Sequence, residues 1–223
     1  MQDKLNLMIP GPTPVPENVL SSMSKHPIGH RSGEFQAIVK KTTEQLKWLH
    51  QTRSDVLTIT GSGTAAMEMV IANRFRSNDL VLVPTNGKFG ERVAEICQRF
   101  CNVKHLKYEW GRAFDLYELE QQLERGCYEA LLICHNETSS GITQDAEAIA
   151  EMCERHNVSF ILDGITSVGG MPVHPAKWKA EAVVMGAQKC TAGPSGIAAI
   201  ALNEHCVERI KAIHQQGDAN PRY

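Results

Sequence analysis

The sequence lacks the features that mark nucleic-acid-binding, membrane-spanning and secreted proteins. Its 23 Lys and Arg are balanced by 25 Asp and Glu and form no basic block, which argues against nucleic acid or anionic membranes as the main partner. The longest apolar runs, such as residues 198–202, are strand-sized, whereas a membrane-spanning helix needs roughly 20 apolar residues. Residues 1–4 carry no signal-peptide pattern. We therefore expect a globular protein with neither nucleic acid nor a membrane among its partners.

The cysteines lack the spacing of a metal site or a disulfide framework. Seven are present, an odd number, and no two form a CxxC pair. Cys97 and Cys101 lie four positions apart on a predicted helix, but without a second pair they predict no zinc, nickel or iron–sulfur site. We expect reduced, buried thiols in a cytoplasmic protein, and no metal.

The chain is long enough for one large domain or two small ones. It has 223 residues, of which 42% are hydrophobic and 22% charged, as in ordinary globular proteins. Residues 10–16 contain four prolines and cannot lie inside a helix. We expect residues 1–33 to form an extended arm lying across a surface, and residues 34–223 to form one large domain.

Short β-branched or leucine-rich segments alternate with segments of helical periodicity along the rest of the chain. The predicted strands cover residues 56–60, 80–84, 103–108, 130–134, 159–162, 182–185 and 197–202. The predicted helices cover residues 34–51, 64–76, 91–100, 116–124, 145–156 and 204–214, with N-caps at Ser32, Asp115 and Asp145. This alternation predicts an α/β fold with a mostly parallel sheet covered on both faces. Chemistry is then expected just after the carboxyl ends of the strands.

A glycine-rich turn leads from the first predicted strand into a helix. Gly61, Ser62, Gly63 and Thr64 are small residues that let backbone N–H groups approach an anion at the helix start. A phosphate is the natural ligand, although the segment matches neither the P-loop nor the dinucleotide fingerprint. The purely structural interpretation is a tight turn with Ser62 or Thr64 as the helix cap.

Two charged residues follow later strands. Asp163 ends the strand at 159–162 and is placed to receive a positively charged ring nitrogen, or else to cap the next turn. Lys189 follows the strand at 182–185 inside a loop of small residues. A lysine in such a pocket can form a Schiff base with a carbonyl. The alternative is an ordinary surface lysine.

Together these three elements describe a pyridoxal-phosphate site, because they supply a phosphate cradle, a carboxylate for a ring nitrogen and a Schiff-base lysine. Phe89, after the strand at 80–84, adds an aromatic ring on which a planar cofactor could stack, although a plain core role fits it equally. Residues 135–141 offer hydroxyl groups to the cofactor ring, or form a helix-capping polar loop.

These motifs resemble the class V pyridoxal-phosphate-dependent aminotransferases, in the branch of the alanine–glyoxylate and serine–pyruvate enzymes. The resemblance runs from about residue 8 to the end of the chain. Its segments are residues 11–16, 29–32, 61–64, 86–90, 135–141, 163–167 and 186–189. The resemblance implies a fold-type I large domain that binds pyridoxal 5′-phosphate.

The resemblance also implies roles for individual residues. Lys189 would form the Schiff base with the cofactor, Asp163 would face the pyridine nitrogen, and Phe89 would stack on the ring where relatives often carry Trp. Thr138 matches the family's hydroxyl position beside the ring. The implied phosphate ligands are Ser62, Gly63, Thr64 and Gln188. Ala187, where relatives often carry Ser, would loosen one phosphate contact.

The resemblance implies an aminotransferase whose substrates are a small amino acid and a 2-oxo acid. Alanine or serine would be the donor, glyoxylate or pyruvate the acceptor, and Lys189 the general base. Family members run well beyond 223 residues, and their small C-terminal domain carries the arginine that binds the substrate carboxylate. We therefore expect a C-terminally truncated fragment without that domain, in which neither Arg31 nor Arg222 is supported as a substitute. Family dimers complete the phosphate site with partner residues, so a homodimer is expected.

Two other interpretations stay open at this point. The chain could belong to the cyanobacterial branch described as the small subunit of a soluble hydrogenase, which is associated with tritium exchange and could form a heterodimer with a larger subunit. A pyridoxal enzyme labilises Cα–H bonds, so isotope exchange needs no metal. Alternatively, the chain could be a non-catalytic large domain that serves as a binding partner.

Overall fold

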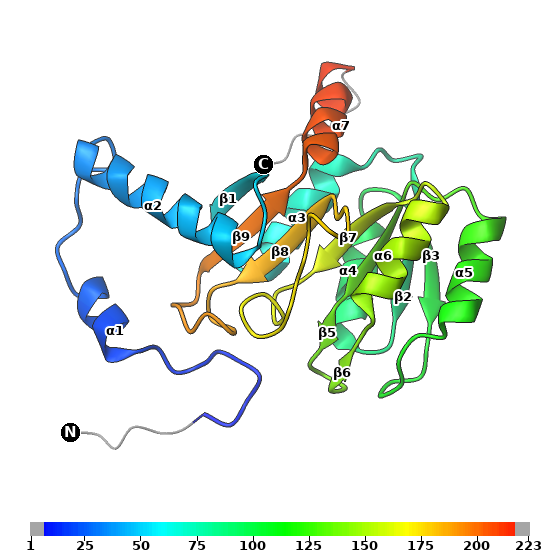
Figure 1. Cartoon of the computed structure of the whole chain (residues 1–223), viewed down its shortest axis with the longest axis horizontal. Helices are drawn as coiled ribbons and strands as arrows, with labels where there is room; N and C mark the ends of the chain where they lie inside the picture. The colour runs from blue at the N-terminus through cyan, green and yellow to red at the C-terminus, as the bar shows by residue number, and fades with distance from the viewer. Residues whose placement is uncertain (1–6, 217–223) are drawn as a thin grey trace.

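A single seven-stranded sheet forms the centre of the protein in the computed structural model, which describes residues 7–216 (Figure 1). Its order is β1-β9-β8-β7-β4-β2-β3. The strands are β1 (Asp55–Thr60), β2 (Leu80–Thr85), β3 (Asn102–Lys107), β4 (Ala130–Cys134), β7 (Ser159–Asp163), β8 (Ala182–Gly186) and β9 (Ile197–Leu202). Each lies within two residues of its predicted position, so the predicted α/β fold is confirmed.

Within these seven strands, all pairings are parallel except those of β9, which is antiparallel to both β1 and β8. Because β9 reverses direction between them, β1 and β8 run the same way. The carboxyl ends of β1, β8, β7, β4 and β2 therefore meet at one edge of the sheet. The turns that follow these strands are the ones that can share a site.

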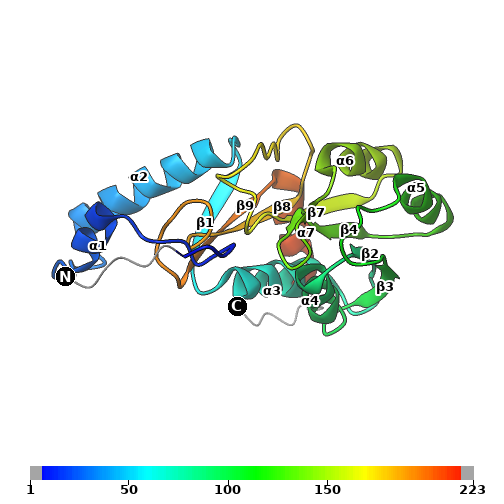
Figure 2. The same ribbon diagram turned by 90° about the horizontal axis from the view of Figure 1, so that it is seen from below.

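Helices cover both faces of the sheet, as Figure 2 shows. The helices α2 (Gly33–Leu49), α5 (Leu116–Arg125) and α6 (Ala146–Arg155) lie over one face. The helices α3 (Gly63–Arg74) and α4 (Lys88–Cys97) lie over the other, where α7 (Glu204–Gln215) packs against α3. The predicted N-caps are confirmed, since the side chains of Ser32, Asp115 and Asp145 each accept hydrogen bonds from backbone N–H groups in the first turn.

The central strands are buried on both faces, which explains their continuous apolar sequence. In β7, Phe160 and Leu162 pack with α5 and α6, whereas Ile161 between them packs with α3 and α4. Val183 and Val184 divide in the same way in β8. All five are at most 2% exposed. Burial of each such side chain contributes roughly 1.5–3 kcal/mol, so the sheet holds its turns on a rigid frame.

The N-terminal segment differs from the expectation of an arm extended throughout. Residues 7–16 hold no helix or strand, and Thr13 attaches them to the turn after β8 by donating its backbone N–H to the carbonyl oxygen of Gln188 (2.9 Å). The short helix α1 (Glu17–Met23) follows, because Pro16 stands at its N-cap in extended conformation and Glu17 carries a negative charge in the first turn. The carboxyl end of α2 packs on the core through Leu46 and Leu49, while the rest of α2 projects away from the sheet (Figure 1).

Two local predictions need correction. The helix expected at residues 91–100 begins earlier, at Lys88, so that Phe89 lies in its first turn and not in a loop. The loop after β4 forms a two-stranded hairpin from β5 (Asn136–Glu137) and β6 (Ile142–Thr143). Both differences have one cause, because side chains of this hairpin bind the start of α4.

The guanidinium of Arg74 lies at the far end of α3, wholly buried beneath the sheet. It donates two hydrogen bonds to the Glu181 carboxylate (2.6 and 3.1 Å), one to Glu129 (3.0 Å) and one to the hydroxyl of Ser159 (3.2 Å). Burial opposes ionisation of Glu181, but the hydrogen bonds and charge of Arg74 outweigh it and lower the pKa of the Glu181 carboxyl. The three partners stand at or next to the amino ends of β8, β4 and β7, so one side chain ties three strands to α3.

Replacing this guanidinium tests how much the tie stabilises the fold. We expect Arg74→Met to lower the free energy of unfolding by about 3–5 kcal/mol, since the buried Glu181 carboxylate loses the guanidinium and keeps Ser159 and the exposed ring of His205 as partners. Urea denaturation followed by circular dichroism measures the change. The matched control is Arg112→Met, which removes an exposed ion pair with Glu109 (2.8 Å) and should cost at most about 1 kcal/mol. Equal losses in the two variants would contradict the prediction.

Candidate active site

A cavity of about 170 Å³ opens at the carboxyl edge of the sheet. Five segments line it: the start of α3, the start of α4, the hairpin after β4, the end of β7 and the turn after β8. The predicted site residues Ser62, Gly63, Thr64, Phe89, Thr138, Asp163, Gln188 and Lys189 all contribute to its walls. Residues up to 127 positions apart in the sequence are therefore gathered around one space because their strands end at the same edge.

The start of α3 forms the wall at which an anion is expected. The hydroxyl of Ser62 accepts a hydrogen bond from the backbone N–H of Ala65 (3.1 Å), so Ser62 is the helix cap as well as a cavity residue. The first N–H groups of a helix have no partner within the helix, and its dipole favours negative charge there. A Cβ atom at Gly63 would lie 2.6 Å from the side chain of Ile165. Glycine at 63 thus lets α3 approach the turn after β7.

Arg92 supplies a cation that the sequence analysis did not assign. Its Nη1 donates to the hydroxyl of Thr64 (3.3 Å), and its guanidinium carbon lies 5.2 Å from the centre of the Phe89 ring. Phe89 and Arg92 are three positions apart on α4, a spacing that puts both on one helix face. That spacing would have revealed Arg92 if the helix had been predicted to start at Lys88.

Asp163 is the last residue of β7 and is 6% exposed. Burial raises the pKa of its carboxyl to about 6, against a hydrogen bond that its Oδ1 accepts from the backbone N–H of Ile165 (2.9 Å). The charge of Glu137 raises this pKa further, whereas Arg92 and Lys189 lower it. Burial therefore disfavours the ionised form of this carboxyl, and a cationic partner in the cavity would stabilise that form.

Lys189 follows β8 in a half-buried turn that the N-terminal segment covers. The hydroxyl of Thr13 donates to the carbonyl oxygen of Lys189 (3.0 Å). A Cβ atom at Gly11, where φ is +140°, would lie 2.5 Å from Cδ and 3.0 Å from Nζ of Lys189. Only glycine allows the backbone this close to the lysine. Gly11 lies within the motif at residues 11–16, whose sequence does not reveal this contact with Lys189.

The side chains of the turn after β4 point in two directions, some into the cavity and one into the core. Asn136 and Thr138 line the cavity. His135 points to the core instead, where its ring lies edge-on to Trp178 at 5.7 Å and burial lowers its pKa to about 4. His135 therefore takes no part in the cavity. Of the hydroxyl groups expected from this motif, that of Thr138 is in the wall.

The cavity residues fit pyridoxal phosphate by their chemistry. The helix start, Thr64 and Arg92 supply donors and positive charge for a phosphate, Asp163 can accept from a ring nitrogen, and Lys189 supplies an amine. The side-chain oxygen of Gln188 is buried and has no hydrogen-bond partner among residues 7–216, which leaves this amide with unused capacity at the wall. Within the same residues, no group of three or more His, Cys, Asp and Glu could hold a metal ion.

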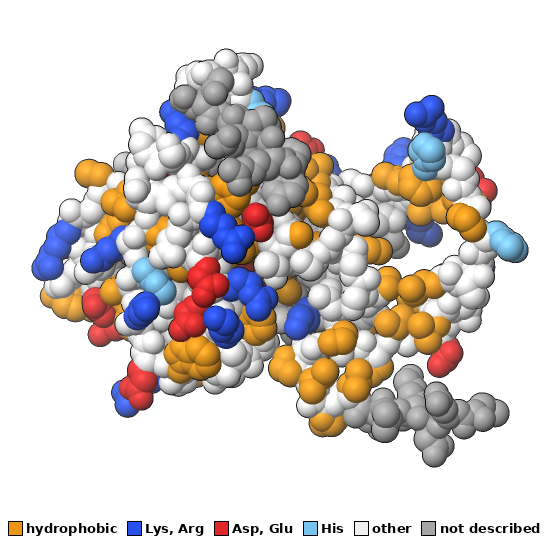
Figure 3. Space-filling model, turned by 180° about the vertical axis from the view of Figure 1, so that it is seen from behind, with side chains coloured by type: hydrophobic (Ala, Val, Ile, Leu, Met, Phe, Trp, Pro, Cys, Tyr) orange, Lys and Arg blue, Asp and Glu red, His pale blue; other side chains and the backbone are white. Residues whose placement is uncertain are grey.

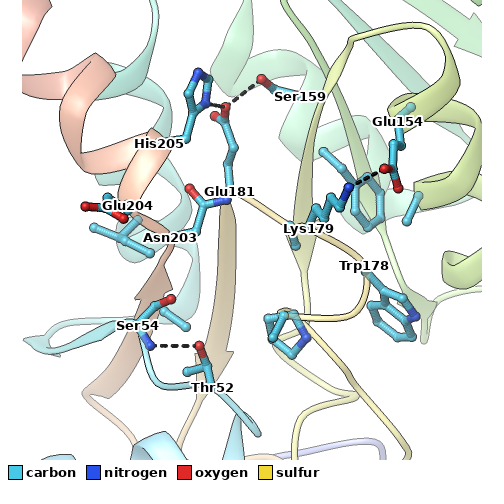
Figure 4. A pocket seen from close by; sticks show the side chains of 18 of the residues that line it. Thr52, Ser54, Glu154, Ser159, Trp178, Lys179, Glu181, Asn203, Glu204 and His205 are labelled. Atoms are coloured by element: carbon cyan, nitrogen blue, oxygen red, sulfur yellow. Dashed lines mark hydrogen bonds and ion pairs between the residues drawn. The ribbon is translucent and has the colours of Figure 1, made fainter.

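A second cavity, of about 970 Å³, lies at the opposite edge of the sheet. Figure 4 shows Glu181 at its centre, bonded to Ser159 and His205, and Lys179 paired with Glu154. These carboxylates already serve the fold, and none of the predicted site residues lines this space. The smaller cavity is therefore the candidate active site.

In the part of the chain that the structure describes, no helix has the length and apolar character to cross a membrane.

Comparisons with known proteins relate nearly the whole chain to one protein family. The profile of the family described as "Aminotransferase class-V" matches residues 6–222. The chain is 41% identical over 216 residues to a soluble hydrogenase small subunit from Synechococcus, covering 95% of this chain and 56% of that protein. A crystal structure of ureidoglycine–glyoxylate aminotransferase from Bacillus subtilis superposes with a TM-score of 0.90 at 34% identity, covering 96% of this chain and 57% of that one.

A further solved structure, alanine–glyoxylate aminotransferase from Nostoc, superposes with a TM-score of 0.89 at 27% identity. The match covers all of this chain and 64% of that one. The chain spans about half the length of the curated relatives that it matches. Arg222, considered above for the substrate carboxylate, lies outside the described residues.

The buried carboxyl of Asp163 should make the stability of the cofactor-free protein depend on pH. Its folded-state pKa of about 6 lies above the ordinary value of 3.8, so the folded state binds more protons than the unfolded state between these values. Stability therefore falls as pH rises from about 4 to about 6. Asp163→Asn removes this penalty and should raise the free energy of unfolding by about 3 kcal/mol at pH 7, with little change near pH 4. Urea denaturation across this range measures it, and a pH-independent difference would contradict the prediction.

Proposed function

The chain belongs to the class-V aminotransferase family, whose cofactor is pyridoxal phosphate, and from that premise we propose that its protein transfers an amino group between a small amino acid and a 2-oxo acid. The observation that carries the proposal is the cavity in which Lys189, Asp163 and the start of α3 line the same space. We propose glyoxylate or pyruvate as acceptor and alanine or serine as donor. Glyoxylate is favoured because it is in the names of the two solved structures described above.

In this proposal each wall of the cavity has a task. Pyridoxal phosphate supplies an aldehyde that condenses with amines and a ring that accepts electrons from the substrate. Ser62, Gly63, Thr64 and Gln188 would hold its phosphate, with Arg92 adding positive charge. Asp163 would pair with its ring nitrogen. This pairing places a cation beside a buried carboxylate, so binding stabilises the charged form of Asp163.

The remaining residues orient the ring and move protons. Phe89 would lie against the ring, and the hydroxyl of Thr138 would bond at its edge. The amine of Lys189 would bond the aldehyde carbon in the resting enzyme. Once released from that bond, the amine would be the base that accepts the α-proton of the substrate, and it would then pass this proton to the cofactor. Gly11 and Thr13 cover the turn that carries Lys189 and would exclude water from it.

Chemical trapping of the lysine tests cofactor and residue together. We expect borohydride reduction of the protein mixed with pyridoxal phosphate to leave a pyridoxyl group on Lys189, identified by peptide mass mapping. Lys189→Ala should lose the adduct and reduce the conversion of alanine to pyruvate at least about 10³-fold, since it removes the base and the covalent attachment. Lys177→Ala, a change at an exposed lysine, is the matched control. An adduct on other lysines alone would refute the assignment.

We also propose that the protein acts as a homodimer through its N-terminal helices. The described residues of α1 and α2 include none that are buried. Leu20, Met23, Ile38 and Val39 are each 44–58% exposed, and Figure 3 shows hydrophobic side chains gathered on this side of the molecule, at its right. An apolar surface of this kind marks an interface. A second copy is the expected partner because family dimers share the phosphate site.

Solution measurements test the dimer. Sedimentation equilibrium should give twice the chain mass for the unmodified protein and the single mass for a variant with Ile38→Asp and Val39→Asp, because two charges in an apolar interface cost several kcal/mol. Tyr117→Asp, at an exposed aromatic residue on α5, should leave the mass unchanged. A monomeric unmodified protein would sink the proposal.

A second candidate function is supported by the 41% identity to the Synechococcus soluble hydrogenase small subunit. Here the chain would take part in hydrogen-isotope exchange, with a larger subunit as its partner. Incubation in tritiated water with alanine, and separately with hydrogen gas, distinguishes the aminotransferase function from the hydrogenase function. Exchange into alanine that is lost in Lys189→Ala supports the aminotransferase, whereas exchange of hydrogen gas with stoichiometric nickel or iron supports the hydrogenase.

A further inference from the structure

Helix α4 carries four cavity residues, Phe89, Arg92, Val93 and Ile96, but begins without a cap of its own. Its N-cap is Gly87, which has no side chain. The caps come from the hairpin about fifty residues further along the chain. The backbone N–H of Gly90 donates to Oε2 of Glu137 (2.8 Å), and that of Lys88 donates to the hydroxyl of Ser139 (2.8 Å).

The two capping side chains are joined to each other. The hydroxyl of Ser139 donates to Oε1 of Glu137 (2.6 Å), and the backbone N–H of Ser139 donates to the same oxygen (3.2 Å). Glu137 is fully buried. Its carboxylate thus accepts three hydrogen bonds and places a negative charge at the positive end of α4.

Close packing admits no other capping arrangement at this helix start. A Cβ atom at Gly87 would lie 2.3 Å from Cγ of Glu137 and 2.6 Å from the hydroxyl oxygen of Ser139. Gly87 therefore leaves the space into which the two side chains reach. A capping residue such as Ser or Asp at position 87 would expel them.

The same hairpin also supplies a wall of the cavity. Thr138 lies between Glu137 and Ser139 in the chain and lines the cavity, as do Phe89 and Arg92 from the first turns of α4. The hydrogen bonds of Glu137 therefore join two walls, one aromatic and cationic, the other carrying a hydroxyl. The negative charge of Glu137 also raises the pKa of the Asp163 carboxyl.

We infer that Glu137 is a positioning residue for the cofactor, which fixes Phe89 and Thr138 on two walls of the cavity. It touches neither substrate nor cofactor and acts through the start of α4. This inference rests on the proposed function, because it takes pyridoxal phosphate as the group that the cavity holds.

Two measurements on one set of variants test the inference. Hydrogen exchange followed by mass spectrometry reports on residues 85–97 without any cofactor, and absorbance titration with induced circular dichroism reports on bound pyridoxal phosphate. We expect Glu137→Ala to speed exchange at the start of α4, to weaken cofactor affinity about tenfold or more and to reduce the induced dichroism of the cofactor band. Glu137→Gln keeps an oxygen for the Gly90 N–H and should recover most of each change.

A second variant keeps the test decisive if Glu137→Ala does not fold. Ser139→Ala removes the bond from the Lys88 N–H and the hydroxyl bond to Glu137, but keeps the bond between Glu137 and the Gly90 N–H. We therefore expect the same three changes at a smaller size than in Glu137→Ala. The matched control is Asp145→Ala, which removes the cap of α6, a helix of the same length as α4 that lines no part of the cavity. It should lower thermal stability without altering exchange at residues 85–97 or the cofactor spectrum.

The outcomes separate this inference from the proposed function. If the unmodified protein binds no pyridoxal phosphate, the proposed function fails, while exchange at residues 85–97 still decides whether Glu137 holds α4. If the unmodified protein binds the cofactor and Glu137→Ala matches it in affinity and dichroism, or changes them no more than Asp145→Ala does, the inference is overturned and the proposed function stands.

Discussion

The buried guanidinium of Arg74 is the interaction on which the rest of the structure depends. It lies at the end of α3 and binds groups at the amino ends of β8, β4 and β7. The opposite ends of these elements carry Lys189, Thr138 and Asp163, and the opposite end of α3 carries the glycine-rich turn that lines the cavity. Because a helix and a buried strand are stiff, fixing them at one edge fixes the positions of their turns at the other. A buried charge is costly unless all its hydrogen bonds are made, so this tie tolerates little variation in strand position.

The chemistry of the site follows from what the sheet edge imposes. Asp163 ends a strand that is buried on both faces, so its carboxylate cannot be hydrated and its pKa rises. The protein bears this cost in the absence of a ligand, and a ring nitrogen that carries a proton would reverse it. Stability and function are therefore opposed at this residue, as is common where binding sites hold unfavourable charges. The cavity gains affinity for a cationic ring from the same burial that destabilises the cofactor-free protein.

Glycines set how closely the walls approach. At Gly11, Gly63 and Gly87 an added Cβ atom would lie within 2.6 Å of Lys189, Ile165 and Glu137 respectively. Each contact joins two segments distant in sequence, and each brings the backbone to the site where a larger residue would hold it away. The hairpin residues 136–139, which comprise β5 and the start of the turn after it, then serve two neighbours at once. Asn136 and Thr138 face the cavity while Glu137 and Ser139 face α4.

The sequence alone determined the order of strands and helices, because the hydrophobic period of each segment is local, and it determined which residue types follow each strand. Ser62, Gly63, Thr64, Phe89, Thr138, Asp163, Gln188 and Lys189 could be nominated on that basis together with a family resemblance. Only the tertiary structure decided that β9 reverses direction, that α4 starts at Lys88, and that Arg92, Gly11 and Glu137 belong to the site. These depend on contacts between segments tens to hundreds of residues apart, and no local pattern records which distant side chain will cap a helix or fill the space beside a glycine.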